Sequence, residues 1–156
     1  MIKEDFEKIK YSEQFKAIVA PSYLVSCFLN DVSGKQLWEY NFYSRETENI
    51  YTFIVDNDQA ILRETNVLLN KKDNPKELYL GNLKLNSKEV IAIVNYFLIR
   101  GYKDDSVSKI ILSIEMDETI IWSVIVILRN LKLINIKVND RNSEVIENKV
   151  ISPLNT

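Results

Sequence analysis

Eight short segments rich in β-branched and aromatic residues run through most of the chain, and they restrict its fold more than any other feature. Four of them occupy residues 23–32, 37–43, 50–55 and 60–69, and four more occupy residues 108–116, 119–128, 131–138 and 144–151. Polar turn sequences such as Ser33-Gly34 and Asp117-Glu118 separate neighbouring segments. Segments of this length and composition are typical of antiparallel strands that follow one another in a meander. The sequence therefore predicts two four-stranded meanders.

A helical pattern precedes each group of strands. Apolar residues within residues 2–18 recur at the spacing of one helical face, and Pro21 ends this segment. Before the second group, Asn86 can cap a helix start while Glu89 reaches back to the cap. We expect one helix over residues 2–18 and another over residues 86–101.

The order of elements is repeated along the chain. A shift of 84 positions aligns Trp38 with Trp122 and Asp56 with Asp140, and the apolar strand positions match in class. We expect these four residues to be structural anchors, one tryptophan and one aspartate in each half. The predicted fold is therefore α+β, with two pseudo-repeated halves that each pack a helix on an antiparallel β-meander.

The length of the chain sets the domain organisation. Its 156 residues suffice for one well-buried domain or two very small ones. The most linker-like stretch is Lys-Lys-Asp-Asn-Pro at residues 71–75. The predicted repeats are residues 1–72 and 73–156, joined into one compact body.

Strand and turn sequences in both halves resemble a known family. The second half reads I-I-W-S-V-I-V around Trp122 and K-V-N-D-R-N-S-E-V-I around Asp140. The first half offers W-E-Y-N-F from Trp38 and V-D-N-D-Q-A-I-L around Asp56. A helix followed by a meander with these features resembles the PepSY family of small cystatin-like domains, here as a tandem duplication. The resemblance implies a non-catalytic binding or inhibitory module, of a kind often linked to peptidases or the cell envelope.

Charge and cysteine content bound the partners and the location. Twenty basic side chains against 22 acidic ones leave a net charge of −2, so nucleic acid is not an expected partner. The single cysteine, Cys27, cannot form an internal disulfide, and the first residues are too charged for a signal peptide. No apolar run approaches the ~20 residues of a membrane-spanning helix. We predict a cytoplasmic, intracellular protein without a transmembrane segment, unless a leader before residue 1 has been removed.

Residues that could support catalysis or hold a metal are few. The chain has no histidine, which is the commonest general base near neutral pH and the commonest metal ligand. Asp56 and Asp140 each open an Asp/Asn-rich sequence, but apolar residues occupy the Gly and Glu positions of a calcium-binding loop, so these are interpreted as turns. The acidic residues Glu115, Asp117 and Glu118 are interpreted as a solvated turn. We expect no cofactor, no metal and no enzymatic activity.

Aromatic residues crowd two neighbouring strands of the first half. Alternation predicts that the face carrying Trp38 packs against the helix, which leaves Tyr43, Tyr51 and Phe53 for the other face. If these three are exposed, they form a binding surface, because aromatic side chains give large contact area at low entropic cost. The alternative is that the two halves pack sheet to sheet and bury them.

Two functional hypotheses follow. The leading one is a non-enzymatic protein-binding or inhibitory module of PepSY-like type, which engages another protein or a second copy of the chain through a sheet face or edge. The alternative is a small-ligand-binding protein or enzyme that uses a cavity between a curved sheet and its helix. An unpaired edge strand or exposed apolar sheet favours the first hypothesis, and a buried polar cluster favours the second.

Overall fold

The computed structural model describes residues 2–18, 20–32, 34–67, 74–101 and 106–151. This part of the chain contains eight β-strands, three α-helices and one short 3₁₀ helix. The chain divides into two compact units, unit 1 over Met1–Asn82 and unit 2 over Leu83–Thr156. The predicted boundary between residues 72 and 73 lies outside the described residues.

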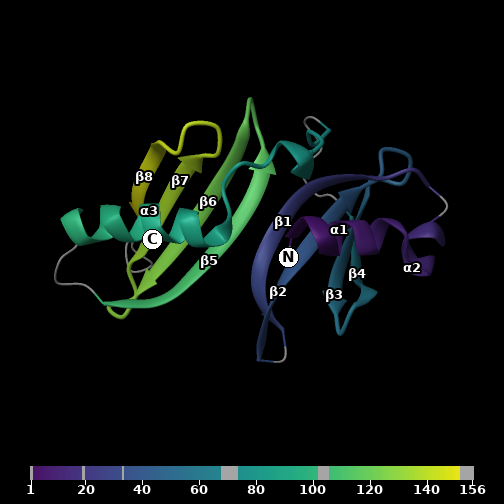
Figure 1. Cartoon of the computed structure of the whole chain (residues 1–156), viewed down its shortest axis with the longest axis horizontal. Coiled ribbons are helices and arrows are strands. Elements are labelled where there is room, and N and C mark those ends of the chain that lie inside the picture. The colour runs from purple at the N-terminus through teal and green to yellow at the C-terminus, as the bar shows by residue number, and fades with distance from the viewer. Residues whose placement is uncertain (1, 19, 33, 68–73, 102–105, 152–156) are drawn as a thin grey trace. The chain divides into compact units, whose positions relative to one another are not determined.

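Unit 1 places two short helices on four antiparallel strands (Figure 1). The helices are α1 (Ile2–Lys10) and α2 (Glu13–Lys16). The strands are β1 (Tyr23–Val32), β2 (Lys35–Tyr43), β3 (Asn49–Asp56) and β4 (Gln59–Val67), and they lie in the order β4-β3-β2-β1. The unit ends with the 3₁₀ turn η1 (Leu80–Asn82). β4 is therefore an outer strand, with β3 as its neighbour.

A two-residue turn joins β3 to β4. Its residues, Asn57 and Asp58, have φ angles of +50° and +62°. Positive φ at both central positions is the geometry of the tight hairpin turn that matches strand twist, and Asn and Asp tolerate it. The interpretation of the sequence after Asp56 as a turn is confirmed.

Aromatic side chains fill the space between the helices and the sheet of unit 1. Phe42 of β2 is buried, and its ring stacks on Phe6 of α1 at a centroid distance of 6.1 Å. The same ring meets Phe53 of β3 edge-on at 5.7 Å and Phe15 of α2 at 4.9 Å. Such edge and offset contacts add to the burial of the rings. Both helices thus cover the face of the sheet that carries Phe42.

Unit 2 packs one longer helix on four further antiparallel strands (Figure 1). The helix is α3 (Ser87–Gly101). The strands are β5 (Val107–Met116), β6 (Ile120–Leu128), β7 (Leu133–Asn139) and β8 (Val145–Ile151), in the order β5-β6-β7-β8. The buried residues of α3 recur every four positions, as Val90, Val94 and Leu98. On β7 they alternate, as Ile134, Ile136 and Val138, so each element presents one apolar face to the core.

The predicted cap of α3 is confirmed. The backbone N–H of Glu89 donates to Oδ1 of Asn86 at 2.9 Å, and the backbone N–H of Asn86 donates to Oε1 of Glu89 at 3.2 Å. These reciprocal bonds satisfy two donors that have no partner within the helix.

The predicted α+β fold of two repeated helix-and-meander halves is wrong. The described chain is predominantly β, with eight strands and three α-helices. The helical parts are also not equivalent, because unit 1 has helices of 9 and 4 residues where unit 2 has one of 15. Strand-favouring residues occupy most of the sequence, and the helices are too few to make a balanced α+β repeat.

The single helix predicted over residues 2–18 is interrupted at Ser12. The Ser12 hydroxyl donates to the carbonyl of Ile9 at 2.7 Å and accepts the N–H of Phe15 at 3.2 Å. A serine that binds backbone groups on both sides ends one helix and caps the next. The apolar spacing continued through this point, which is why the pattern gave no sign of the break.

Candidate functional site

The three aromatic residues predicted to form a binding surface lie on two different faces of the unit 1 sheet. Strand register pairs Tyr40 with Phe53 and Phe42 with Tyr51, so Phe53 and Tyr51 share the helix-covered face. Phe53 is fully buried there, and Tyr51 is half-buried. The alternation of side chains within each strand was predicted correctly. The register between β2 and β3, however, places Tyr51 and Phe53 on the helix-covered face and not on the opposite face that was predicted.

Tyr43 lies on the opposite face and is covered by the chain that follows β4. Its hydroxyl donates to Oδ1 of Asn74 at 3.1 Å, and its ring meets the ring of Tyr23 edge-on at 5.9 Å. The Tyr23 hydroxyl donates to the carbonyl of Pro75 at 2.7 Å, and the N–H of Leu78 donates to the carbonyl of Leu24 at 2.8 Å. Tyr43 is 3% exposed as a result, so it offers no open surface in this structure.

In unit 2 the predicted anchors Trp122 and Asp140 are in direct contact. The indole Nε1–H of Trp122 donates to Oδ1 of Asp140 at 3.0 Å. The backbone N–H groups of Lys84 and Leu85 donate to the same carboxylate at 2.8 and 2.9 Å. Asp140 therefore ties the segment before α3 to strand β6, and three donors compensate the burial of its charge.

The corresponding residues of unit 1 do not form this arrangement. Asp56 is half-buried, and its carboxylate accepts from Nζ of Lys35 at 3.1 Å. Trp38 is half-buried on β2. A surface ion pair of this kind contributes little to stability. The 84-residue shift thus aligns Asp56, whose carboxylate is half-buried, with Asp140, whose carboxylate is fully buried.

The outer strands β4 and β8 are the candidate interaction site. Every residue from 61 to 67 on β4 and from 146 to 151 on β8 is exposed. Within the described chain, β4 pairs with β3 and β8 pairs with β7, and each is the last strand on its side. An outer strand bonds its neighbour through alternate backbone groups and leaves the other N–H and C=O groups open to another strand.

The two outer strands differ in how far their open edges are occupied. On β4, the N–H of Leu62 donates to Oε1 of Gln14 on α2 at 2.5 Å. On β8, Lys137 of β7 reaches Glu147 at 3.4 Å across the strand pair, on the sheet side of β8. Within the described residues, the edge of β8 is the more open of the two.

From the sequence we expected binding through a sheet face or edge, but we did not predict which strands form the edges. The available signal was the mixture of charged and apolar residues in the last strand of each meander. That mixture contrasts with β6, where Ser123 is the only polar residue and which pairs with β5 along one edge and with β7 along the other.

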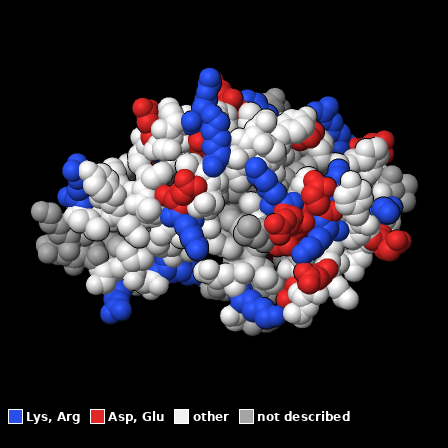
Figure 2. All heavy atoms as spheres, viewed as in Figure 1, with Lys and Arg blue, Asp and Glu red and all other residues white. Residues whose placement is uncertain are grey.

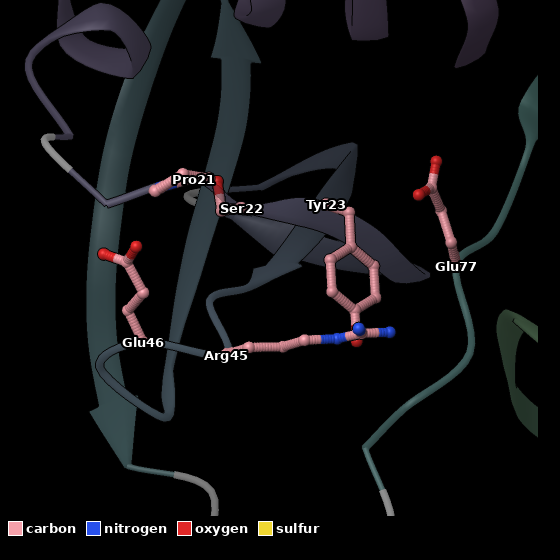
Figure 3. Close-up of a pocket in the computed structure, with 6 residues that line it drawn as sticks. All are labelled: Pro21, Ser22, Tyr23, Arg45, Glu46 and Glu77. Carbon is pink, nitrogen blue, oxygen red and sulfur yellow. The ribbon is translucent and has the colours of Figure 1, made fainter.

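A shallow pocket lies where β1 begins and the loop between β2 and β3 passes (Figure 3). It has a volume of about 430 Å³ and is lined by Pro21, Ser22, Tyr23, Arg45, Glu46 and Glu77. Figure 3 shows the Arg45 guanidinium beside the hydroxyl end of Tyr23, while the carboxylates of Glu46 and Glu77 point away from it. A hydrogen bond with Tyr23 raises the pKa of Arg45, whose guanidinium is in any case charged at neutral pH.

Two further pockets lie on the surface of unit 2. One, of about 590 Å³, is lined by Lys84, Glu118, Thr119, Asn139, Arg141 and Asn142. The other, of about 540 Å³, is lined by Glu115, Met116, Asp117, Ile121, Lys137, Ile146 and Glu147. No helix residue lines any of the three pockets, so none of them is a cavity between a helix and a sheet. The predicted acidic turn contributes to both pockets of unit 2.

Two buried titratable groups of unit 1 have strongly raised pKa values. Burial raises the pKa of the Cys27 thiol above its ordinary value of 9.0 and raises the pKa of the Tyr40 hydroxyl above 10.0. Tyr40 also donates its hydroxyl hydrogen to the carbonyl of Ile2 at 2.7 Å. A neutral, inaccessible thiol is neither a nucleophile nor a metal ligand. Among the described residues, no group of three or more His, Cys, Asp and Glu side chains is arranged to hold a metal ion.

Surface charge and helix length are the features relevant to binding of nucleic acid and to crossing a membrane. On the face shown in Figure 2, basic and acidic side chains are interspersed and neither sign forms a continuous patch. Within the part of the chain that the structure describes, no helix is long and apolar enough to cross a membrane.

Comparison with known proteins identifies a similar fold. No family profile matches the chain, and no curated protein matches it in sequence. A solved structure from Clostridium difficile 630, described as a "putative lipoprotein", matches with a TM-score of 0.58 at 14% sequence identity. The match covers 83% of this chain and 83% of that one. The chain therefore shares its fold with that protein over most of its length.

This comparison corrects the predicted location. The sequence favoured a cytoplasmic, intracellular protein, whereas the fold match is to a protein described as a "putative lipoprotein". The prediction rested on the charge of the first residues and on one cysteine, and neither feature is a property of the fold. The match shows a fold similar to that of the solved structure. It does not assign the chain to the PepSY family, and no family profile matches.

Proposed function

We propose that this chain is a non-enzymatic, protein-binding module that acts outside the cytoplasm and engages an extended polypeptide segment through its outer strand β8. The observation that supports this proposal is the open edge of β8, where residues 146–151 are all exposed. An extended segment can add to such an edge through backbone hydrogen bonds, while alternate side chains give specificity.

The side chains of β8 suit this mode of binding. Ile146, Val150 and Ile151 are 51%, 46% and 43% exposed, so each has apolar surface left to bury. Glu147 and Lys149 lie between them. Burial of apolar area supplies affinity, and the two charges select the register and direction of the added strand.

The location outside the cytoplasm is supported by the fold match to a protein described as a lipoprotein. A cell fractionation of the natural gene product tests it. We expect the protein in the membrane fraction and accessible to protease added outside the cell. Recovery in the cytosolic fraction would overturn this part of the proposal.

Cross-linking in intact cells tests the binding mode. We expect the double variant Ile146→Lys/Val150→Lys to lose the complexes that the wild type forms, because lysine on an edge strand opposes further pairing. The matched control is Ile61→Lys/Leu62→Lys on β4, where the two side chains are 37% and 36% exposed. Complexes that persist in the β8 variant, or that disappear only in the β4 variant, would contradict the proposed site.

A further inference from the structure

The sequence of β8 is complementary to itself when it runs in the opposite direction. It reads Val-Ile-Glu-Asn-Lys-Val-Ile from residue 145 to residue 151. In an antiparallel pair of two such strands centred on Asn148, Glu147 of each strand lies opposite Lys149 of the other. On either side of these charged pairs, every apolar residue lies opposite an apolar one.

We propose that β8 pairs antiparallel with β8 of a second copy of this chain, about a two-fold axis at Asn148. This inference rests on the proposed function, since it names the segment that the open edge of β8 accepts. A two-fold axis makes the interface self-complementary, so a single strand supplies both sides. The symmetry also closes the association at two copies through this edge.

Charge favours a second copy as the occupant. Opposite charges directly across an antiparallel pair stabilise it, and like charges destabilise it. Register places Glu147 opposite Lys137 and Lys149 opposite Asn135 on one face of the sheet. In the paired form each Glu147 carboxylate lies between Lys137 of its own chain and Lys149 of the other copy.

The irregular part of β8 lies outside the centre of this register. The pairing with β7 shifts between Val145 and Glu147, so the strand is regular from Glu147 to Ile151. The three central pairs, which include both charged pairs, use regular residues. The pairs at the ends each involve one residue from the shifted part and contribute apolar contact.

The outer strand of unit 1 does not offer the same site. The N–H of Leu62 is already bonded to Oε1 of Gln14. The α2 helix thus occupies part of the β4 edge. An unpaired edge is the condition for strand addition, and β8 meets it more fully.

Analytical ultracentrifugation of the purified chain and two charge variants tests the inference. A single strand pair is a small interface, so we expect a weak, reversible dimer with a dissociation constant between about 1 μM and about 1 mM. Glu147→Lys places lysine opposite Lys149 twice, and Lys149→Glu places glutamate opposite Glu147 twice. We expect each variant alone to dimerise about tenfold or more weakly than the wild type.

An equal mixture of the two variants is the decisive sample. In a mixed dimer both charged pairs are attractive again, so we expect dimers to return that neither variant forms alone. Glu64→Lys on exposed β4 is the matched control, and we expect it to dimerise like the wild type. Since the mixture requires both variants to be folded, a return of dimers also excludes misfolding as the cause of their loss.

Three results would overturn the inference. The first is a wild-type chain that stays monomeric at about 1 mM. The second is a dimer whose affinity is unchanged in both charge variants. The third is a mixture that stays monomeric while both variants retain the wild-type circular dichroism. If the purified chain is monomeric but the in-cell complexes are still lost with Ile146→Lys/Val150→Lys, the proposed function stands and the occupant is a different protein. If those complexes also persist, the proposed function fails with it.

Discussion

At the scale of the residue, the two aspartates that align in sequence have different energetic roles. Asp140 is 2% exposed and accepts three hydrogen bonds, from two backbone amides and from Trp122. Asp56 lies at the surface and pairs with Lys35. We expect Asp140→Ala to lower the free energy of unfolding by about 3 kcal/mol, because it leaves buried donors without an acceptor.

Asp56→Ala is the control for that change. We expect it to lower the free energy of unfolding by less than about 1 kcal/mol, because exposed ion pairs contribute little. Urea denaturation followed by circular dichroism measures both. Equal losses in the two variants would contradict the different roles that we assign to them.

At the scale of the element, α3 is the helix whose start the sequence specifies in full. Asn86 and Glu89 bond each other's backbone N–H groups. We expect Asn86→Ala to cost about 1 kcal/mol of stability, which is typical for loss of an N-cap. Lys88→Ala, an exposed position in the same turn, is expected to change stability by less than about 0.5 kcal/mol. A urea titration in which the two variants unfold together would show that the cap does not stabilise the helix.

Strands are less completely specified than α3. Composition and turns predicted eight strands, and eight are present among the described residues. Alternation within a strand assigns side chains to one face or the other, but it does not say which face of the next strand matches. The pairing of Tyr40 with Phe53 decided that. A shift of one residue in register moves every side chain of a strand to the other face, and so Phe53 lies in the core.

At the scale of the whole molecule, both groups with strongly raised pKa values lie in unit 1, and this predicts a dependence on alkaline pH. Cys27 and Tyr40 keep their protons in the folded chain because burial disfavours their charged forms. In the unfolded chain they ionise near pH 9 and 10, their ordinary values. Their contribution to stability therefore falls by about 1.4 kcal/mol per pH unit, above about pH 9 for Cys27 and above about pH 10 for Tyr40.

Fluorescence can follow this loss in unit 1, because each unit holds one of the two tryptophans, Trp38 and Trp122. In a Trp122→Phe background, we expect the urea midpoint reported by Trp38 to fall between pH 8 and about pH 10.5. Adding Cys27→Ala should make that decline shallower, since one of the two ionising groups is gone. A midpoint that stays constant over this range would refute the assignment.

The sequence by itself determined the local features of this protein: the strand segments, the Asn-Asp turn after Asp56 and the cap of α3. Each depends on residues that are close in the chain, so its physical cause is visible in a short stretch. Tertiary structure alone decided that Asp140 is buried and Asp56 is not, that Tyr43 is covered by residues 74–78, and that β8 is an open edge. These features depend on which distant segments come together, and the composition of a strand does not by itself specify which strands pair with it.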